Sequence, residues 1–593
     1  MSWKDTYQVW KERTDLEPKL KQELAAMTDE QEIKDAFYGP LSFGTAGMRG
    51  LMGPGINRMN VYTVRQATEG LATLMDSLGD EVKQRGVAIG YDSRHNSYRF
   101  AHDSARVLGA HGIKVYIYDN VRPTPELSFA VRQMETYAGI MITASHNPKE
   151  YNGYKIYGED GGQMPPKESD MMTGYIRKID DIFDIQLADE QEMLDNGLET
   201  IMGEDVDHAY LQLAKEVTVN PELAKQYGKD MKFVFTPLCG TGRMLGERAL
   251  RQAGFTNFTI EPTEAQPNGD FPGLEHPNPE FPEAFVRSIA LGKKIDADVL
   301  IATDPDADRL GCAVRQPDGE YQLLTGNQIA TIMLAYILEA RKQAGTLPKN
   351  AAAVKSIVST NFAAKVAASY GVDMINVLTG FKWIADQIHQ YETGKADHTF
   401  MFGFEESYGY LIKPFVRDKD AIQSLTLLAE VAAYYRSRDM TLYDGLQELF
   451  KKYGYFREKT IANTYAGVDG PAKIQNLMKK FREEAPADFA GHKVAVTEDF
   501  SKGTKTTADG QVSELGIPES NVLRYVLDDE TWIVAYECRK QWNENGLVIP
   551  AFFNHALRGW LIMLRFNPLN TIPVLGSPHS SYASLLIGKV ASV

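Results

Sequence analysis

The chain has 593 residues, of which 43% are hydrophobic and 24% are charged, and its net charge is −16. This length predicts several domains, about four at roughly 100–200 residues each, and the composition is that of a globular protein. The acidic balance argues against a nucleic-acid-binding protein, which needs clustered lysine and arginine to neutralise phosphates. Three scattered cysteines are too few for a disulfide framework or a zinc site, which favours a reducing, intracellular compartment.

The amino terminus is charged throughout and has no apolar core of the signal-peptide kind. No stretch reaches the ~18 uninterrupted apolar residues of a membrane span. The most apolar candidate, residues 546–566, is broken by His555 and Arg558. We therefore expect a cytoplasmic protein with no membrane and no nucleic-acid partner. The amphipathic pattern fits a monomer and a dimer equally well.

Short β-rich runs alternate with amphipathic stretches, which predicts an α/β protein with mixed or parallel sheets. Each predicted strand runs directly into a polar or glycine-containing loop. Ligands in open α/β sheets bind beyond the carboxyl ends of the strands, so these loops are the candidate sites. The predicted buried strands are Val87–Tyr91, Gly139–Thr143, Lys232–Thr236, Val299–Thr303, Ser356–Ser359 and Thr399–Phe402.

Changes of pattern near residues 205, 322 and 460 predict the domain boundaries. The acidic, weakly patterned stretch Asp180–Asp207 is expected to be an insertion or a linker. The proline-rich stretch Glu261–Pro282 is expected to be a long ordered loop inside the second domain. The predicted domains are residues 1–205, 206–322, 323–460 and 461–593.

The first candidate loop is Gly44–Gly50, whose three glycines permit close approach of the backbone to an anion that Arg49 can clamp. An ordinary glycine-rich turn is an equally frequent explanation of this pattern. Tyr91–Arg94 ends another strand and adds a second arginine. Thr379–Lys382 offers a further cation, for which a lone surface lysine is the alternative.

Ser145 follows the strand that ends at Thr143 and has no neighbouring Asp–His relay in the sequence. A serine in such a loop often only satisfies a turn. However, His146, Asn147 and Lys155 bring hydrogen-bond donors near the same point. A phosphorylated serine carries about −1.5 to −2 charges and three acceptor oxygens, and it needs such donors and a cation. Besides a serine that only satisfies a turn, we therefore consider the hypothesis that Ser145 carries a phosphate.

The segment Asp304-Pro-Asp-Ala-Asp-Arg309 follows the apolar run at residues 299–302. Carboxylates at alternate positions of an extended loop project to one side. Such hard oxygen ligands suit Mg²⁺, which usually completes its shell with phosphate oxygens or water. A solvated acidic loop is the alternative, although three aspartates there would repel one another. The adjacent Arg309 would position or neutralise a phosphoryl oxygen.

The segment Gly403-Phe-Glu-Glu-Ser-Tyr-Gly409 also follows an apolar strand. Carboxylates and a hydroxyl held by a rigid turn can bind sugar hydroxyls. The alternative is a helix N-terminus, where glutamate is electrostatically favourable and serine caps the helix.

The motifs FGTAGMRG, TASHNP, DPDADR and GFEES, in this order, together resemble the α-D-phosphohexomutase superfamily and its long phosphoglucomutase branch. The resemblance covers roughly residues 1–535. It implies four α/β domains around a central cleft, each contributing one loop. It also implies an Mg²⁺-dependent enzyme of the isomerase class that interconverts α-D-glucose 1-phosphate and glucose 6-phosphate. A phosphoserine and glucose 1,6-bisphosphate, which serves as activator and intermediate, would carry the phosphoryl group.

The resemblance further implies individual roles. Ser145 would be the phosphoserine, and Arg49 and Lys155 would complete the catalytic set. Lys155 would act as a general acid or base if burial lowered its pKa. The implied metal ligands are Ser145 through its phosphate, Asp304, Asp306 and Asp308. The implied substrate-binding residues are His146, Arg309, Thr379, Gly380, Lys382, Glu405 and Ser407.

The chain departs from the family pattern after the strand expected at Glu530–Val534. Family members continue with an Arg-Pro-Ser-Gly-Thr-Glu-Pro loop that grips the distal phosphate, whereas this chain continues Ala-Tyr-Glu-Cys-Arg-Lys-Gln-Trp. Residues 536–593 contain only two acidic residues, as in a frame-altered or a divergent segment. Each lost charge-assisted hydrogen bond is worth about 1.5–3 kcal/mol, so we expect weaker substrate binding and more phosphatase leakage. Arg539 with Lys540, or residues 565–577, are the candidate replacements.

Other functions stay open because the sugar loop alone does not determine the sugar. A phosphopentomutase, a phosphomannomutase and a glucose-1,6-bisphosphate synthase are the related alternatives. A catalytically impaired homologue that lacks the distal phosphate loop and serves binding or regulation is the alternative from a different class.

Overall fold

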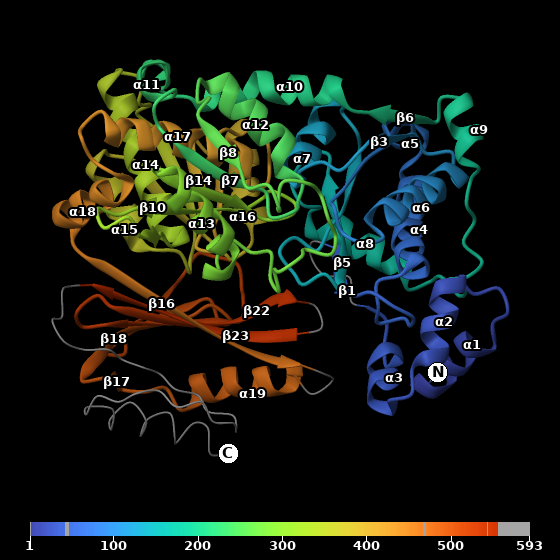
Figure 1. The fold of residues 1–593 in the computed structure, drawn as a ribbon. Helices are drawn as coiled ribbons and strands as arrows, with labels where there is room; N and C mark the ends of the chain where they lie inside the picture. Colours follow the sequence, from blue (N-terminus) through green and yellow to red (C-terminus); the bar gives the residue numbers. More distant parts are fainter. Residues whose placement is uncertain (1, 42–46, 467–469, 542–543, 555–593) are drawn as a thin grey trace. The chain divides into compact units, whose positions relative to one another are not determined.

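The computed structural model describes residues 2–41, 47–466, 470–541 and 544–554. The chain divides into two compact units, the first built on residues up to 449 and the second on residues from 450 onward. Figure 1 shows the first unit as sheets flanked by helices and the second as one larger sheet with a long helix. Within the described residues, no helix is long and apolar enough to cross a membrane.

Three short helices precede the first sheet, and they pack against its core through buried side chains that include Trp10 and Phe37. The sheet has the strand order β1-β5-β4-β2-β3-β6, in which β2, β3, β4 and β6 run parallel, while β5 is antiparallel to β4 and to β1. The bounds are α1 (Trp3–Glu12), α2 (Pro18–Ala26), α3 (Glu30–Phe37), β1 (Gly47–Leu51), β2 (Val87–Tyr91), β3 (Val115–Tyr118), β4 (Ala138–Ile142), β5 (Tyr151–Gly158) and β6 (Glu199–Met202).

Helices cover both faces of this sheet, and Figure 1 shows α4 and α6 on one side and α7 on the other. The helix α4 begins where Asn60 and Thr63 form a capping box, and its apolar side is buried. The bounds are α4 (Val61–Leu78), α5 (Asp80–Arg85), α6 (Ser97–Ala110), α7 (Thr124–Gln133), α8 (Pro166–Ile176) and α9 (Glu190–Asp195).

The second and third sheets repeat the plan of the first, because in each a parallel strand pairs on one side with an antiparallel neighbour. Their orders are β11-β10-β9-β7-β8 and β13-β12-β14-β15. The antiparallel pairs are β9 with β10, β10 with β11, and β14 with β15. The bounds are β7 (Phe233–Thr236), β8 (Phe258–Ile260), β9 (Val299–Thr303), β10 (Leu310–Arg315), β11 (Tyr321–Leu323), β12 (Ala351–Ser356), β13 (Asp373–Val377), β14 (Thr399–Glu405) and β15 (Gly409–Leu411).

The helices of these two sheets are α10 to α18, with two short 3₁₀ turns. The helix α17 is buried along almost its whole length, which fits its nearly uninterrupted apolar sequence. The bounds are α10 (Glu204–Ala214), η1 (Lys215–Val217), α11 (Pro221–Tyr227), α12 (Gly242–Ala253), η2 (Pro282–Phe285), α13 (Val286–Ile295), α14 (Gly326–Gln343), α15 (Asn361–Ser369), α16 (Phe381–Glu392), α17 (Ala421–Arg436) and α18 (Leu442–Tyr453).

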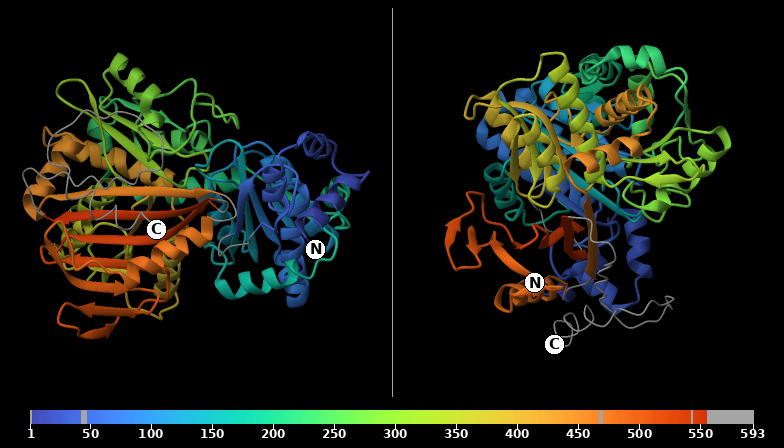
Figure 2. Two further views of the ribbon diagram at one scale, coloured as in Figure 1. Left: turned by 90° about the horizontal axis from the view of Figure 1, so that it is seen from below. Right: turned by 90° about the vertical axis from the view of Figure 1, so that its left-hand side faces the viewer.

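The second unit is one sheet in the order β16-β23-β22-β21-β18-β19-β20, with β17 paired to β18. The helix α19 packs Ile474 and Met478 against Leu523, Tyr525 and Ile533, and both views of Figure 2 show it lying along the sheet. The bounds are β16 (Phe456–Ala466), α19 (Gly470–Glu483), β17 (Asp488–Phe489), β18 (His492–Asp499), β19 (Thr504–Thr507), β20 (Val512–Glu514), β21 (Val522–Leu527), β22 (Trp532–Gln541) and β23 (Glu544–Asn554).

The structure confirms the α/β fold class and corrects two local predictions. The strand expected at Ser356–Ser359 is β12, which ends at Ser356, and the apolar residues after it form a turn. The stretch Asp180–Asp207 is not an insertion outside the sheet, because it contributes α9, the edge strand β6 and the start of α10. Its pattern is weak because an edge strand and a short surface helix bury few side chains. The proline-rich stretch at 261–281 is a loop, as expected.

Candidate active site

Ser145, the three aspartates and Ser407 lie on three equivalent turns of the three sheets. Each turn joins a parallel strand to its antiparallel neighbour: β4 to β5, β9 to β10, and β14 to β15. Each turn also holds one non-glycine residue in the left-handed region, namely Ser145 (φ 52°), Ala307 (φ 51°) and Tyr408 (φ 65°). Backbone strain of this kind persists only where the surrounding structure enforces it, and it concentrates at functional sites.

The Ser145 side chain is buried and bonded to the acidic loop of the second sheet. Its Oγ–H donates to Asp304 Oδ2 at 2.7 Å, and its Oγ lies 3.2 Å from His146 Nδ1. The Ser145 backbone N–H donates to Thr143 Oγ1 at 2.8 Å. The predicted serine and the first predicted aspartate are therefore in direct contact.

Two arginines hold the serine loop in shape. Arg94 is fully buried, and its guanidinium donates to the carbonyl oxygens of Ser145, Asn147 and Pro148. Arg94 therefore positions the loop backbone rather than offering a free cation. Arg49 Nη1 donates to Asn147 Oδ1 at 2.9 Å, and burial lowers the pKa of Arg49 to about 10.

Asp304, Asp306 and Asp308 bring three buried carboxylates together, with one oxygen of each within 4.8 Å of the others. The N–H groups of Asp308 and Arg309 both donate to Asp304 Oδ1, which fixes the loop. Asp306 Oδ1 and Asp308 Oδ1 are buried and have no hydrogen-bond partner among the described residues. Buried carboxylate oxygens without a partner, in an all-oxygen set, are what a hard divalent cation requires, so the triad can bind a metal ion.

Lys155 lies against this acidic loop. Its Nζ is 2.8 Å from Asp306 Oδ2 and 3.4 Å from Asp308 Oδ2. Burial lowers the pKa of Lys155, but Asp306 and Asp308 outweigh burial, so that its pKa is raised. The condition set for a general base at Lys155, a pKa lowered by burial, is therefore not met, because the burial that removes water also strengthens the attraction of the two carboxylates.

The electrostatics of the three aspartates differ although all are buried. Burial, Asp308 and Asp306 all raise the pKa of Asp304. Burial also acts to raise the pKa of Asp306, but Lys155 outweighs it and lowers that pKa. The pKa values of Asp304 and Asp306 are thus shifted in opposite directions, and Lys155 is the main cause of the difference.

Arg309 follows the acidic loop, and its guanidinium forms an ion pair with Glu280 from the proline-rich loop. Its Nε lies 3.8 Å from Asp308 Oδ1. Burial lowers the pKa of Arg309, but Glu280 and Asp308 outweigh burial and raise it. A phosphate bound by Arg309 would have to exchange with Glu280.

Glu405 is the last residue of β14 and Ser407 lies on the turn from β14 to β15, which excludes the alternative of a helix N-terminus. Both residues are buried, and Glu405 Oε1 accepts from the Gly380 N–H at 2.8 Å. Burial raises the pKa of Glu405. The structure therefore joins two of the predicted substrate loops, Thr379–Lys382 and Gly403–Gly409.

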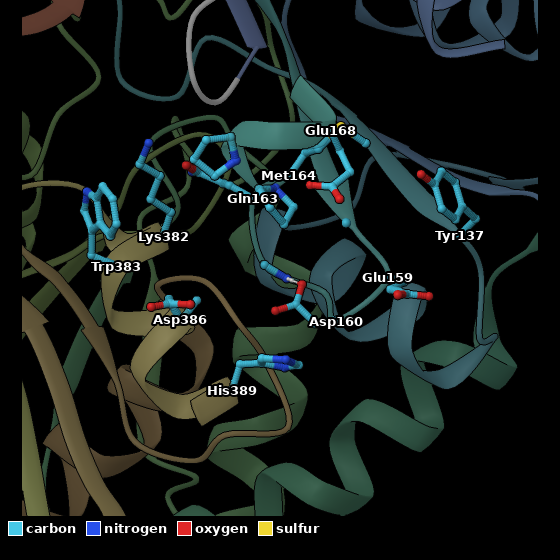
Figure 3. Close-up of a pocket in the computed structure, with 15 residues that line it drawn as sticks. Tyr137, Glu159, Asp160, Gln163, Met164, Glu168, Lys382, Trp383, Asp386 and His389 are labelled. Carbon is cyan, nitrogen blue, oxygen red and sulfur yellow. Dashed lines mark hydrogen bonds between the residues drawn. The ribbon is translucent and has the colours of Figure 1, made fainter. Parts of the chain in front are cut away.

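Lys382 lines a cavity of about 300 Å³ between the start of α16 and the loop after β5, shown in Figure 3. Gln163 lines the same cavity, and its Nε2 lies 3.5 Å from Asp418 Oδ2. Burial lowers the pKa of Lys382. No hydrogen bond or ion pair of the described residues connects Thr379 or Lys382 directly to the acidic loop, so these two stand apart from Ser145.

Four residues of the site carry no motif in the sequence. Lys419 Nζ lies 3.1 Å from Asp308 Oδ2 and 2.9 Å from Asp418 Oδ1. Thr124 Oγ1 donates to Asp306 Oδ2 at 2.8 Å. Asp418 and Lys419 left a signal, since Arg417–Asp420 is a run of four charged residues directly before the apolar helix α17. The four residues are Thr124, Glu280, Asp418 and Lys419.

Parts of the predicted site lie outside the described residues. Within Gly44–Gly50, residues 44–46 are not described. The strand expected near Glu530–Val534 is β22, which continues to Gln541, but the side chains of Arg539 and Lys540 and all of residues 565–577 lie outside the description. The consequence expected for the distal phosphate therefore stays a prediction.

Comparison with known proteins identifies three segments of one family. Residues 40–182, 208–319 and 325–453 match, in order, the α/β/α domains I, II and III described as phosphoglucomutase/phosphomannomutase. A phosphoglucomutase of Staphylococcus epidermidis is 40% identical over 503 residues, which cover 84% of this chain and 89% of that protein. A phosphoglucomutase of Staphylococcus saprophyticus is 37% identical over 501 residues, with coverage of 84% and 89%.

Two solved structures share the fold at low sequence identity. A putative phosphomannomutase from Thermus thermophilus has a TM-score of 0.63 at 20% identity and covers 86% of this chain and 95% of its own. The parafusin (phosphoglucomutase) of Paramecium has a TM-score of 0.64 at 19% identity, with coverage of 87% and 91%. The domain matches and the staphylococcal relatives confirm the resemblance: this chain belongs to the phosphoglucomutase/phosphomannomutase family of the α-D-phosphohexomutase superfamily.

Proposed function

We propose that this protein is a phosphoglucomutase that interconverts α-D-glucose 1-phosphate and glucose 6-phosphate through a phosphorylated Ser145. The observation that carries the proposal is the 2.7 Å hydrogen bond from Ser145 Oγ to Asp304 Oδ2, which sets a buried hydroxyl on a three-carboxylate cation site. The similarity to staphylococcal phosphoglucomutases supports glucose as the sugar. We propose further that the protein is cytoplasmic and has four domains with boundaries near 205, 322 and 460.

We assign Asp304, Asp306 and Asp308, with the phosphate of Ser145, to one Mg²⁺ ion. When bound, the ion would neutralise charge that develops on the phosphoryl oxygens during transfer. The orphaned oxygens of Asp306 and Asp308 support this assignment.

The first transfer moves the phosphoryl group from Ser145 to the sugar phosphate. The bond between phosphorus and Ser145 Oγ breaks, a bond from phosphorus to the free hydroxyl of the sugar phosphate forms, and one proton passes from that hydroxyl to Ser145 Oγ. Glucose 1,6-bisphosphate results, and the same steps in reverse with its other phosphate release the product. Because the pKa of Lys155 is raised, Lys155 enters as an ammonium. We assign to its Nζ the relay of this proton: the ammonium gives a proton to Ser145 Oγ, and the neutral amine then takes the proton that the sugar hydroxyl loses.

Substrate contacts are assigned to the loops around this centre. His146 and Arg309 adjoin Ser145 and the acidic loop, and Arg49 would bind phosphoryl oxygens beside them. Glu405 and Ser407 would bind sugar hydroxyls. The hydrogen bond from the Gly380 N–H to Glu405 Oε1 links this turn to the loop that also holds Thr379 and Lys382.

A coupled assay with each sugar phosphate, with and without glucose 1,6-bisphosphate, tests the proposal. We expect glucose 1-phosphate to give the highest kcat/KM, Ser145→Ala to be inactive, and the exposed control Ser437→Ala to be active. A preference for mannose or pentose phosphates would reassign the sugar. Net accumulation of glucose 1,6-bisphosphate would indicate a synthase, and absence of turnover with every substrate would indicate an impaired homologue.

A further inference from the structure

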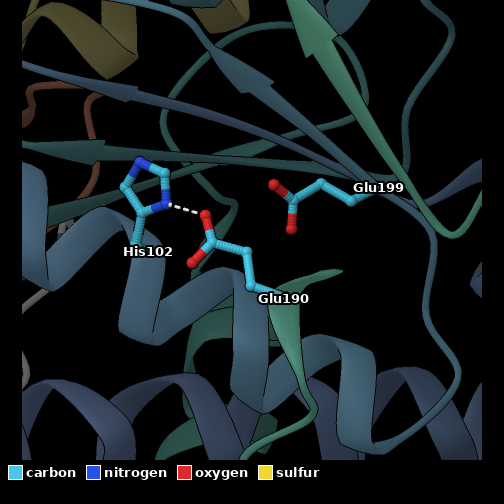
Figure 4. Close-up of side chains that lie close together, drawn as sticks. All are labelled: His102, Glu190 and Glu199. Carbon is cyan, nitrogen blue, oxygen red and sulfur yellow. Dashed lines mark hydrogen bonds and ion pairs between the residues drawn. The ribbon is translucent and has the colours of Figure 1, made fainter. Parts of the chain in front are cut away.

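Away from the candidate active site, His102, Glu190 and Glu199 converge at the edge of the first sheet. His102 lies on α6, Glu190 is the first residue of α9, and Glu199 is the first residue of the edge strand β6. One ligand atom from each residue lies within 4.8 Å of the other two. Figure 4 shows the Glu199 carboxylate turned toward the imidazole of His102 and the carboxylate of Glu190.

Glu199 is a buried acid without a partner. The residue is 3% exposed, and neither carboxylate oxygen has a hydrogen-bond partner in the described part of the chain. Burial and the neighbouring Glu190 carboxylate raise the pKa of Glu199 to about 7. Buried carboxyl groups in folded proteins are almost always hydrogen-bonded, paired with a cation or bound to a metal. Because Glu199 forms no ion pair with a described lysine or arginine, the compensating charge is missing from this part of the chain.

The other two residues are paired with each other. His102 Nδ1 lies 2.8 Å from Glu190 Oε1, and the imidazole packs against the ring of Tyr98 with a centroid separation of 4.0 Å. The His102 side chain is 13% exposed, whereas that of Glu190 is 43% exposed, so the cluster is open to solvent on the Glu190 side. One imidazole nitrogen and two carboxylate oxygens, with one open side for water, form a donor set that suits zinc and similar ions.

We propose that His102, Glu190 and Glu199 form a second metal site, which binds a divalent transition ion of the zinc class with water in the open position. The ion neutralises both carboxylates and joins α6 to the segment that carries α9 and β6. That segment buries few side chains, because α9 buries only Met193 and β6 is an edge strand. The competing explanation is a protonated Glu199 that donates to Glu190, but no hydrogen bond joins the two residues among those described.

Equilibrium dialysis of the full chain against Zn²⁺, followed by metal analysis, tests this site. Asp306→Asn is used as the background, because Zn²⁺ also binds carboxylates and the acidic loop must be disabled. His492, Asp528 and Asp529 also bring three possible ligand atoms together, so bound Zn²⁺ is compared between variants. Adding Glu199→Gln to this background should weaken one Zn²⁺ site at least about tenfold, because loss of a ligand costs no less than loss of an outer partner. Glu192→Gln replaces an exposed carboxylate on α9, the helix that carries Glu190; it is the control and should leave Zn²⁺ binding unchanged.

Thermal unfolding gives a second readout. Zn²⁺ should raise the Tm of Asp306→Asn and of its Glu192→Gln derivative, and it should leave the Tm of the Glu199→Gln derivative unchanged. If Asp306→Asn does not fold, single Glu199→Gln should bind one Zn²⁺ fewer than the wild type. Zn²⁺ binding that Glu199→Gln leaves intact, or the absence of a Zn²⁺ site outside the acidic loop, would overturn the proposal and leave Glu199 as a buried protonated acid.

Discussion

Replacing Lys155 with methionine removes an ammonium group that pairs with the buried Asp306 and Asp308, and Lys419 then still pairs with Asp308 but not with Asp306. The Lys155 Nζ lies 2.8 Å from Asp306 Oδ2 and 3.4 Å from Asp308 Oδ2, and the three side chains are at most 10% exposed. Breaking a buried pair by removing one partner costs about 3–5 kcal/mol, because an uncompensated charge stays buried. We therefore expect Lys155→Met to lower the free energy of unfolding by about that amount in metal-free buffer.

Mg²⁺ should recover part of this loss, because a divalent cation compensates the same carboxylates and no ammonium then competes for Asp306 Oδ2. The assay is thermal unfolding in EDTA and in saturating Mg²⁺, with Lys355→Met as control. Lys355 is also buried, but its Nζ donates to the Ser359 carbonyl at 3.0 Å, so Mg²⁺ should not reduce the cost of its loss. Equal Tm values for Lys155→Met and the wild type in EDTA, or a difference that Mg²⁺ leaves unchanged, would refute the reasoning.

Three further predictions concern the scaffold around the site. Burial raises the pKa of Asp420 to about 6. The Tm of the wild type should therefore fall relative to that of Asp420→Asn as pH rises from about 4 to 6, because the folded state then holds a proton that the unfolded state has released. A Tm difference that does not change with pH would contradict this. A methyl group at Gly240 would overlap the main chain of Pro305, which lies between Asp304 and Asp306. Gly240→Ala should therefore displace the acidic loop and weaken Mg²⁺ binding in calorimetric titrations. An unchanged Mg²⁺ affinity would count against this prediction. Burial raises the pKa of the Cys239 thiol to about 11 and that of Cys312 further, so both should resist alkylation until the protein unfolds; rapid labelling of either in the native state would be inconsistent with the structure.

The strands that the sequence predicted well are short, fully buried runs of branched apolar residues bounded by polar loops. The predicted Val87–Tyr91 and Val299–Thr303 match β2 and β9 residue for residue. The exception is β12, which begins with Ala351-Ala-Ala. Alanine favours helices, so the local sequence argues against a strand here. The strand forms because β12 pairs with β13 and with β14.

For the candidate site, local motifs were informative and long-range partners were not. The sequence placed Ser145 and Asp304 on separate loops, and the structure brings them into hydrogen-bonding contact. Lys419 pairs with Asp308 from a distant segment, and no spacing rule could connect the two. The sign of the Lys155 pKa shift was likewise hidden, because it depends on two carboxylates that only the fold brings to that ammonium.

The central claim is that Ser145 carries the phosphoryl group, and peptide mass spectrometry after incubation with glucose 1,6-bisphosphate and Mg²⁺ tests it most directly. We predict one added phosphoryl group on the peptide that contains Ser145, its discharge when glucose 1-phosphate is added, and no phosphorylation of Ser145→Ala. An unmodified Ser145, a phosphoryl group on another residue, or mutase activity retained by Ser145→Ala would contradict the account.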